Sequence, residues 1–115
     1  MSRDLPKGDI PTLILATLAD GSLHGYAIAR EVDRATKDAL RLREGALYPA
    51  LRILEQDGMV TSEWIVPTAG GASRRVYSLT EQGRGELARR SREWRLYASF
   101  MSAVLGKGEP DAEPT

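Results

Sequence analysis

The amino-acid sequence predicts a mainly α-helical fold with one small β-hairpin, an α+β class. Three segments in the first half of the chain carry apolar residues at helical spacing. Two short alternating segments joined by a glycine-rich turn follow, and a long helical segment comes last. This order predicts a winged helix-turn-helix with an added C-terminal helix. A chain of 115 residues is of a size for one hydrophobic core.

The first two helices have recognisable start and stop residues. Asp9 is expected to cap a helix whose apolar run, residues 13–18, ends at Asp20 and Gly21. Residues 25–38 form the second predicted helix, because their apolar residues recur at helical spacing. Residues 1–8 are expected to be a flexible N-terminal arm.

The third helix is predicted from about Glu44 to Asp57, with Gly58 at its left-handed end. Its core stripe consists of Leu47, Ala50, Leu51 and Leu54, and its outer face of Gly45, Tyr48, Pro49, Arg52 and Gln56. Proline is expected to cost few hydrogen bonds here, because the first N–H groups of a helix lack partners. The outer face is therefore a candidate recognition surface.

A β-hairpin is predicted after the third helix. Met59 to Pro67 and Arg74 to Leu79 alternate as half-buried strands do, and the turn between them, residues 68–73, is small and glycine-rich. Trp64 shares the even spacing of Val60 and is assigned to the core. Residues 9–79 are thus assigned to the winged helix-turn-helix.

The last helix, assigned to residues 80–106, is predicted to start after Thr80 as N-cap and to run to Leu105. Its apolar residues fall at nearly heptad spacing: Leu87, Trp94, Ala98, Met101 and Leu105, with Tyr97, Phe100 and Val104 beside them. A domain this small cannot cover so much apolar surface, so the helix is expected to pair with a second copy. The acidic tail, residues 107–115, is expected to be disordered.

Composition argues against several classes of function. The chain has no cysteine and one histidine, which argues against a disulfide framework and a metal site, and no cofactor is expected. No nucleophile with a matching base and no phosphate-binding glycine loop is found, so an enzyme is not expected. The apolar run at residues 13–18 is too short to cross a bilayer, and no signal-cleavage pattern follows. A cytoplasmic protein without a membrane partner is expected.

Charge is balanced overall but unevenly distributed. The net charge is zero, which counts against a nucleic-acid partner, yet residues 1–106 hold 15 basic and 13 acidic residues. Thirteen of the 16 cations are arginine, the side chain best suited to phosphates and guanine edges. Several of them cluster at Arg41, Arg43, Arg52, Arg74 and Arg75. Double-stranded DNA is therefore the expected partner.

Four motifs resemble the PadR family of bacterial transcriptional regulators. They are Leu23-His24-Gly25-Tyr26, Gly45-Ala46-Leu47-Tyr48-Pro49-Ala50-Leu51, Leu54-Glu55-x-x-Gly58 and Arg75-x-Tyr77-x-Leu79-Thr80-x-x-Gly83. The resemblance covers roughly residues 9–105, and the single C-terminal helix resembles the short branch of the family. Ala46 and Val76 depart from the residues common in the family, a hydroxyl and an aromatic side chain respectively.

The resemblance implies a homodimeric repressor joined through the first and last helices. Two recognition helices would enter successive major grooves of an inverted repeat near the protein's own promoter. In the family, effectors include phenolic acids and bulky aromatic drugs, so a small aromatic effector that releases the repressor is a candidate partner. The alternative is a winged-helix protein-interaction module without sequence-specific DNA binding.

The candidate DNA-binding residues are Tyr26, Gly45, Ala46, Tyr48, Pro49, Arg52, Ser73, Arg74 and Arg75. Tyr48 has two interpretations, a DNA contact or a half-buried side chain that supports the second helix. Arg52 either binds DNA or is a solvated surface residue. Adjacent strand residues point to opposite faces, so at most one of Arg74 and Arg75 is expected to face DNA while the other pairs with an acid. The lone His24 is interpreted as a capping or packing residue.

The candidate residues of the dimer or effector interface are Leu13, Leu87, Trp94, Tyr97, Ala98, Met101 and Leu105. Trp94 either stacks on an aromatic effector between subunits or simply packs in the dimer core, and the two roles are compatible.

Overall fold

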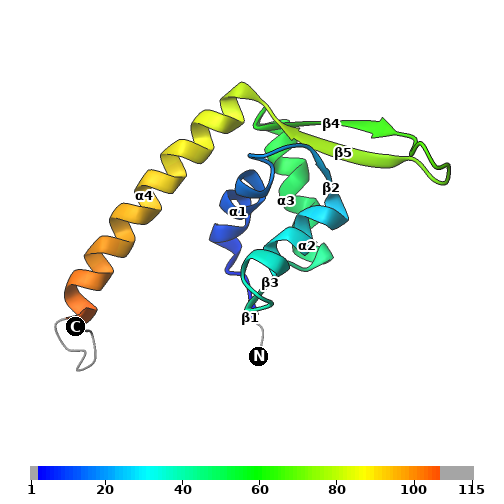
Figure 1. Cartoon of the computed structure of the whole chain (residues 1–115). Helices are drawn as coiled ribbons and strands as arrows, with labels where there is room; N and C mark the ends of the chain where they lie inside the picture. Colours follow the sequence, from blue (N-terminus) through cyan, green and yellow to red (C-terminus); the bar gives the residue numbers. More distant parts are fainter. Residues whose placement is uncertain (1–2, 107–115) are drawn as a thin grey trace.

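The computed structural model describes residues 3–106 and shows the four predicted helices and the hairpin in the predicted order (Figure 1). Three two-residue strands that precede the third helix were not predicted. The helices are α1 (Ile10–Thr17), α2 (Gly25–Ala35), α3 (Glu44–Gln56) and α4 (Glu81–Leu105). The strands are β1 (Arg3–Asp4), β2 (Leu23–His24), β3 (Leu40–Arg41), β4 (Val60–Ile65) and β5 (Arg74–Leu79). The first three helices form the body, from which the β4–β5 hairpin and α4 extend on opposite sides. The predicted α+β fold class is confirmed.

The hydrophobic core lies where α1, α2 and α3 meet at the base of the hairpin. Its fully buried side chains come from all three helices, from the residue that follows α1 and from β4: Ile14, Leu15, Leu18, Ile28, Leu47, Leu51 and Val60. Leu54 is also buried, and Ala50 is half-buried against the core. The inward stripe predicted for the third helix is therefore confirmed, and the opposite face of α3 is left exposed.

The hairpin belongs to a three-stranded antiparallel sheet in the order β2-β5-β4. Because β2 pairs only with Val76 and Tyr77, it holds the base of the hairpin, and the outer half leaves the body. The assignment of Trp64 to the core is consequently wrong, since its side chain is 67% exposed. The alternating residues show correctly which side chains share one face of the strand. Beyond Ser62, however, that face extends past the core and its side chains are exposed.

Residues 3–8 depart from the flexible arm that the sequence predicts. β1 pairs in parallel with β3, and the Arg3 N–H donates to the Ala39 carbonyl at 2.8 Å. Lys7–Asp9 form one 3-10 helical turn, and Leu5 packs against the core. Main-chain pairing and the partial burial of Leu5 therefore hold this segment against the body. Residues 1 and 2, and the tail at 107–115 for which disorder is predicted, lie outside the described residues.

Side chains cap two of the helices. Thr80 accepts a hydrogen bond from the Gly83 N–H at 2.9 Å, which confirms the predicted cap of α4. His24 accepts one through Nδ1 from the Ala27 N–H at 3.3 Å and so caps α2. Asp9 makes no capping bond, because its backbone is already helical at the end of the preceding turn. The predicted Asp9 cap is wrong.

Pro49 lies further inside its helix than the sequence suggests. α3 begins at Glu44, so Pro49 is its sixth residue, beyond the four N–H groups that lack intrahelical partners. The ring therefore removes one helical hydrogen bond, the one that the Gly45 carbonyl would accept. Both residues lie on the exposed side of α3, where water can satisfy that carbonyl.

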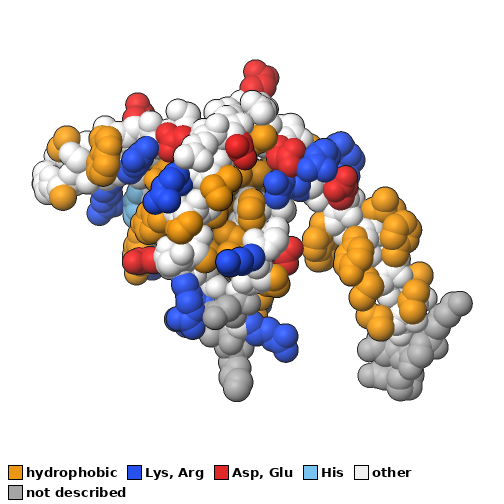
Figure 2. Space-filling model, turned by 180° about the vertical axis from the view of Figure 1, so that it is seen from behind, with side chains coloured by type: hydrophobic (Ala, Val, Ile, Leu, Met, Phe, Trp, Pro, Cys, Tyr) orange, Lys and Arg blue, Asp and Glu red, His pale blue; other side chains and the backbone are white. Residues whose placement is uncertain are grey.

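α4 packs against α1 and β5 near its start and then leaves the body (Figure 1). Gly83 is its only buried residue, and Trp94, Tyr97, Phe100, Val104 and Leu105 are all at least 59% exposed. Hydrophobic side chains gather along the far half of the helix (Figure 2). The helix thus presents an uncovered apolar face. No helix within residues 3–106 combines the length and apolarity that crossing a membrane requires.

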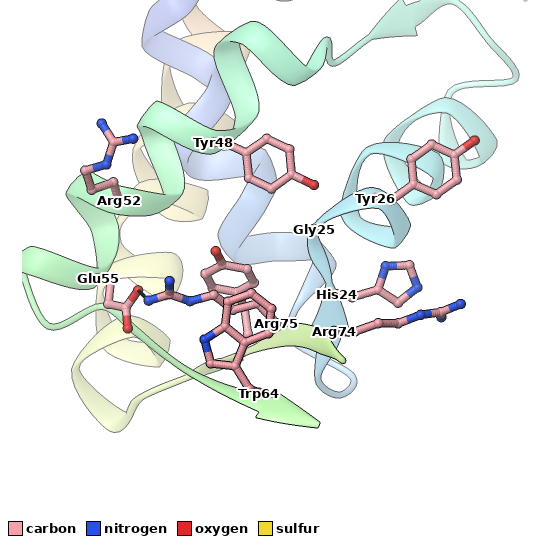
Figure 3. Close-up of a pocket in the computed structure, with 10 residues that line it drawn as sticks. His24, Gly25, Tyr26, Tyr48, Arg52, Glu55, Trp64, Arg74 and Arg75 are labelled. Atoms are coloured by element: carbon pink, nitrogen blue, oxygen red, sulfur yellow. Dashed lines mark hydrogen bonds and ion pairs between the residues drawn. The ribbon is translucent and has the colours of Figure 1, made fainter. Parts of the chain in front are cut away.

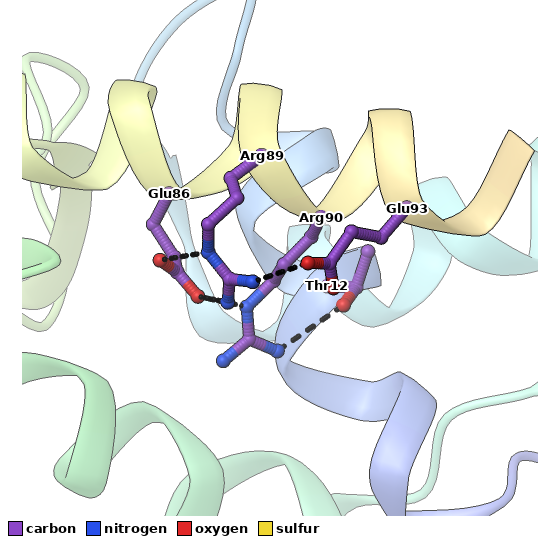
Figure 4. A network of polar contacts seen from close by, with 5 residues as sticks. All are labelled: Thr12, Glu86, Arg89, Arg90 and Glu93. Atoms are coloured by element: carbon purple, nitrogen blue, oxygen red, sulfur yellow. Dashed lines mark hydrogen bonds and ion pairs between the residues drawn. The ribbon is translucent and has the colours of Figure 1, made fainter. Parts of the chain in front are cut away.

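Polar contacts fix the start of α4 against α1 (Figure 4). Glu86 accepts from Arg89 Nη2 and from Arg90 Nε, each at 2.6 Å, and Arg90 Nη1 donates to Thr12 Oγ1 of α1 at 3.2 Å. Hydrogen bonds from Arg89 and Arg90 lower the pKa of Glu86 from 4.5 to about 2. The charged form of Glu86 therefore holds Arg90 in position to reach α1.

We expect acid to remove this stabilisation. Because the pKa of Glu86 is lower in the folded chain, its contribution is complete above pH 4.5 and is lost as the pH falls toward 2. Glu86→Gln should therefore lower the free energy of unfolding at pH 6, and its difference from the wild type should shrink by pH 3. Urea unfolding of both proteins between pH 3 and 6 measures this. A difference that stays constant with pH would contradict the assignment, and Glu93→Gln, at an exposed ion pair, is the control.

Candidate nucleic-acid interface

A concave surface lies between the start of α2, the outer face of α3 and the hairpin (Figure 3). Its volume is about 580 Å³. We call it the α3–wing concavity, and it is lined by His24, Gly25, Tyr26, Tyr48, Arg52, Glu55, Trp64, Arg74, Arg75 and Tyr77. Five of the nine predicted DNA-binding residues are among these: Tyr26, Tyr48, Arg52, Arg74 and Arg75. Helix-turn-helix and wing therefore form one surface.

The other four predicted residues lie outside that lining. Gly45 and Pro49 are exposed on α3, and Ser73 is exposed just before β5. Ala46 is half-buried against the core, so most of its methyl group is turned from the outer face. Of the predicted residues of α3, Tyr48 and Arg52 line the concavity, and Arg52 extends outward (Figure 3).

Tyr48 is held by a glycine of α2. A Cβ atom placed on Gly25 would lie 2.7 Å from Tyr48 Cε1 and 2.8 Å from its hydroxyl oxygen. The ring therefore occupies the space that any other residue at position 25 would need. Tyr48 remains 40% exposed, so it packs on α2 and still presents one side to solvent. Tyr48 therefore packs against α2, as one of the two interpretations predicts, and its ring is still accessible to solvent.

We expect Gly25→Ala to show this packing. The new methyl group meets the Tyr48 ring and should destabilise the fold by about 1–2 kcal/mol. In a Tyr48→Ala background the obstacle is gone, and the same substitution should become neutral or slightly stabilising, because alanine favours a helix over glycine. Urea unfolding of the four proteins of this double-mutant cycle is the measurement. Equal costs in both backgrounds would contradict the contact.

The two wing arginines have different surroundings (Figure 3). Arg75 donates from Nη2 to Glu55 Oε1 at 3.2 Å and from Nε to Ser62 Oγ at 2.9 Å. Arg74 extends on the side of His24, is exposed, and has no hydrogen bond or ion pair among residues 3–106. This arrangement matches the expectation that one of the pair meets an acid, and it identifies Arg75 as that one.

Five residues of the lining were not among the predicted DNA-binding residues: His24, Gly25, Glu55, Trp64 and Tyr77. Glu55 and Gly25 enter it as partners of Arg75 and Tyr48, and Trp64 enters because the hairpin leaves the core. Burial raises the pKa of Tyr77, which forms the floor beside them. Gly25 and Glu55 belong to the motifs Leu23-His24-Gly25-Tyr26 and Leu54-Glu55-x-x-Gly58, and these motifs are the sequence signal that could have identified them.

The predicted interface residues divide into two groups. Leu13, Leu87 and Trp94 line a second cavity of about 680 Å³ between α1, α4 and the N-terminal segment, together with Arg3, Leu5 and Arg95. Tyr97, Ala98, Met101 and Leu105 lie further along α4 and do not line it. Ala98 is half-buried, whereas Tyr97, Met101 and Leu105 are exposed. The contribution of the N-terminal segment to this cavity was not predicted, because the sequence predicts a flexible arm at residues 1–8.

In the part of the chain that the structure describes, no three His, Cys, Asp or Glu side chains are grouped so that they could hold a metal ion. His24 instead uses Nδ1 as a helix cap.

Comparison with known proteins decides the family. The sequence model of the transcriptional regulator PadR-like family matches residues 14–89. This chain belongs to the PadR-like family. The PadR-like match covers α2, α3 and the hairpin, together with parts of α1 and α4. The resemblance recognised in the motifs is confirmed, and the family consists of transcriptional regulators rather than enzymes.

Individual similar proteins, all transcriptional regulators, agree with this. The chain is 36% identical over 104 residues to the transcriptional regulator Rv3488 of Mycobacterium tuberculosis, with 90% of each protein covered. A PadR family transcription regulator from Clostridium difficile has a similar solved structure, at a TM-score of 0.75 and 31% identity, covering 85% of this chain and 99% of that one. A transcriptional regulator from Clostridium thermocellum gives a TM-score of 0.76 at 27% identity, with 84% and 90% covered.

Proposed function

We propose that this PadR-like regulator binds double-stranded DNA through the α3–wing concavity. The observation that supports this most strongly is the exposed Arg74, a cation with no partner among the described residues, beside the exposed Tyr48 and Arg52 of α3. An uncompensated arginine can bind a phosphate without first giving up an ion pair. α3 is then the recognition helix for the major groove, and the hairpin follows the adjacent backbone.

The proposed assembly is a homodimer joined through α1 and α4. Its support is the apolar face of α4, which this chain leaves exposed over Trp94, Tyr97, Phe100, Val104 and Leu105. A second copy would bury that face and place two α3 helices on an inverted repeat. The proposed role is repression near the protein's own promoter, in the cytoplasm where the chromosome lies.

A mobility-shift titration with the DNA upstream of the protein's own gene tests the proposal. We expect a shift at low salt that weakens as salt increases, because phosphate contacts dominate such binding. No shift at low salt would contradict DNA binding and favour the protein-interaction module. A scrambled duplex of the same length is the control for sequence specificity.

The proposed effector is a small aromatic compound that enters the cavity lined by Leu13, Leu87 and Trp94. Trp94 is 60% exposed, and an indole face stacks well on a planar ring. Such a compound should release DNA in the same mobility-shift assay. A panel of planar aromatic compounds, with and without a carboxylate, would also show whether Arg95 at the cavity contributes.

We expect Trp94→Ala to weaken the response to aromatic compounds more than the affinity for DNA, because the indole lines the cavity but lies away from the α3–wing concavity. Trp94→Phe, which keeps an aromatic ring, is the matched variant and should retain most of the response. DNA affinity with and without compound, followed by fluorescence anisotropy, is the measurement. Equal loss of both activities, with monomers in sedimentation, would leave Trp94 only a packing role.

A further inference from the structure

A hydrogen-bonded bridge joins the end of α3 to the inner face of the hairpin. β2 holds only the base of β5, so within residues 3–106 no strand of the body lies beside the outer half of the hairpin. Glu55, in the last turn of α3, reaches both hairpin strands (Figure 3). It accepts from Ser62 Oγ on β4 at 2.7 Å and from Arg75 Nη2 on β5 at 3.2 Å.

Arg75 is the centre of this bridge. Its Nε donates to Ser62 Oγ at 2.9 Å, so the guanidinium joins both strands and α3 at once. The guanidinium carbon lies 5.9 Å from the ring centres of Trp64 and of Tyr77. These distances are in the range of cation–π contact, and both rings share the hairpin face of Arg75, because Trp64 pairs with Arg75 and Ser62 with Tyr77.

We propose that Arg75 is a positioning residue of the wing and not a phosphate contact. This inference rests on the proposed DNA-binding function. Glu55 already compensates its charge, and its Nε and Nη2 donate to Ser62 and Glu55, so a phosphate that bound these two groups would have to displace Glu55. The neighbouring Arg74 points to the other face and is the cation that meets DNA. Glu55, Ser62 and Arg75 together set the angle at which the wing reaches the backbone.

The variant Glu55→Gln separates this role from a direct contact, because the two roles predict opposite signs. If Arg75 binds phosphate and Glu55 merely competes for it, removing the carboxylate frees Arg75 and tightens DNA binding. If Arg75 positions the wing, the same change loosens the hairpin and weakens binding. Glu63→Gln is the matched control, since it removes one exposed carboxylate from the same hairpin on the opposite face.

The first measurement is DNA affinity as a function of salt. We expect Glu55→Gln and Arg75→Ala to bind DNA about fivefold more weakly than the wild type. The slope of log affinity against log salt concentration, called the salt slope below, should be unchanged. Their double variant should be no weaker than either one. Glu63→Gln should bind as well as the wild type or more tightly. Tighter binding by Glu55→Gln, or a slope that falls by about 0.9 in Arg75→Ala, would overturn the proposal.

The variant Arg75→Lys separates the effect of the positive charge from the effect of the guanidinium geometry. Lysine keeps the positive charge but lacks the fork that joins Ser62 to Glu55. The variant should therefore resemble Arg75→Ala. Wild-type affinity in Arg75→Lys would overturn the positioning role.

A second measurement needs no DNA. The chain has no cysteine, so Ala72→Cys near the wing tip and Ala35→Cys at the end of α2 can carry two spin labels without further changes. Labelled chains diluted with unlabelled ones report the distance within a single copy. We expect the distance distribution to broaden in Glu55→Gln and Arg75→Ala and to stay narrow in Glu63→Gln. Unchanged distributions would overturn the bridge even if DNA binds, whereas a wild type that binds no DNA would overturn only the proposed function.

Discussion

Gly83→Ala should destabilise the fold by about 3 kcal/mol, the largest stability change expected for a single methyl group in this chain. A Cβ atom at this position would overlap the Met59 carbonyl oxygen and would also crowd Leu79 at 3.1 Å. The obstacle is main chain, which cannot turn aside as a side chain can. The first turn of α4 would have to move, although Thr80 Oγ1 ties it to the Gly58 carbonyl at 2.6 Å.

Gly85→Ala is the matched control for this prediction. Gly85 lies two residues further along α4 and is exposed, and a Cβ atom there would meet no neighbouring group within 4 Å among the described residues. Alanine there should stabilise the helix by up to about 1 kcal/mol. Urea unfolding of both variants at one protein concentration gives the comparison, because association with a second copy would shift the midpoint with concentration. Equal stabilities would contradict the close approach of α4 to the residue that precedes β4.

Arg74→Ala should produce the largest loss of DNA affinity among the wing variants. Losing one charge-assisted contact to phosphate should weaken binding about tenfold at low salt and reduce the salt slope by about 0.9. The fall should be similar on specific and scrambled duplexes, because phosphate contacts carry no sequence information. Affinity titrations at four or five salt concentrations give the slope.

Arg92→Ala, at an exposed cation of α4 away from the α3–wing concavity, is the control for net charge. It should leave the slope close to that of the wild type. If Arg74→Ala and Arg92→Ala lowered affinity and slope equally, the effect would reflect overall charge and the role assigned to Arg74 would be wrong.

Local sequence signals predicted the elements well. Apolar spacing identified Leu47, Leu51 and Leu54 as the buried stripe of α3, and the hydroxyl of Thr80 marked the start of α4. Both signals depend on residues within one or two helical turns. The resemblance to PadR-like proteins, carried by short motifs, identified the family that the comparisons then confirmed.

Long-range contacts were beyond the reach of such signals. Trp64 has the right alternation for a core strand, but the point at which a hairpin leaves the body depends on the length of β2 elsewhere in the chain. Similarly, the pairing of Arg75 with Glu55 joins residues 20 positions apart, and the sequence could only predict that one wing arginine would meet an acid. Asp9 has the residue type of a cap, yet the helical turn before it removes the backbone geometry that capping requires.

The proposed DNA interface is most directly tested by mapping amide chemical shifts as the upstream DNA is added to the isotope-labelled protein. We expect the largest changes at residues 44–52 of α3 and 73–77 at the start of β5, the two segments that border the α3–wing concavity. Residues 94–105 of α4, on the opposite side of the body, should change little. Changes confined to α4, with α3 and the hairpin unaffected, would contradict the proposed interface.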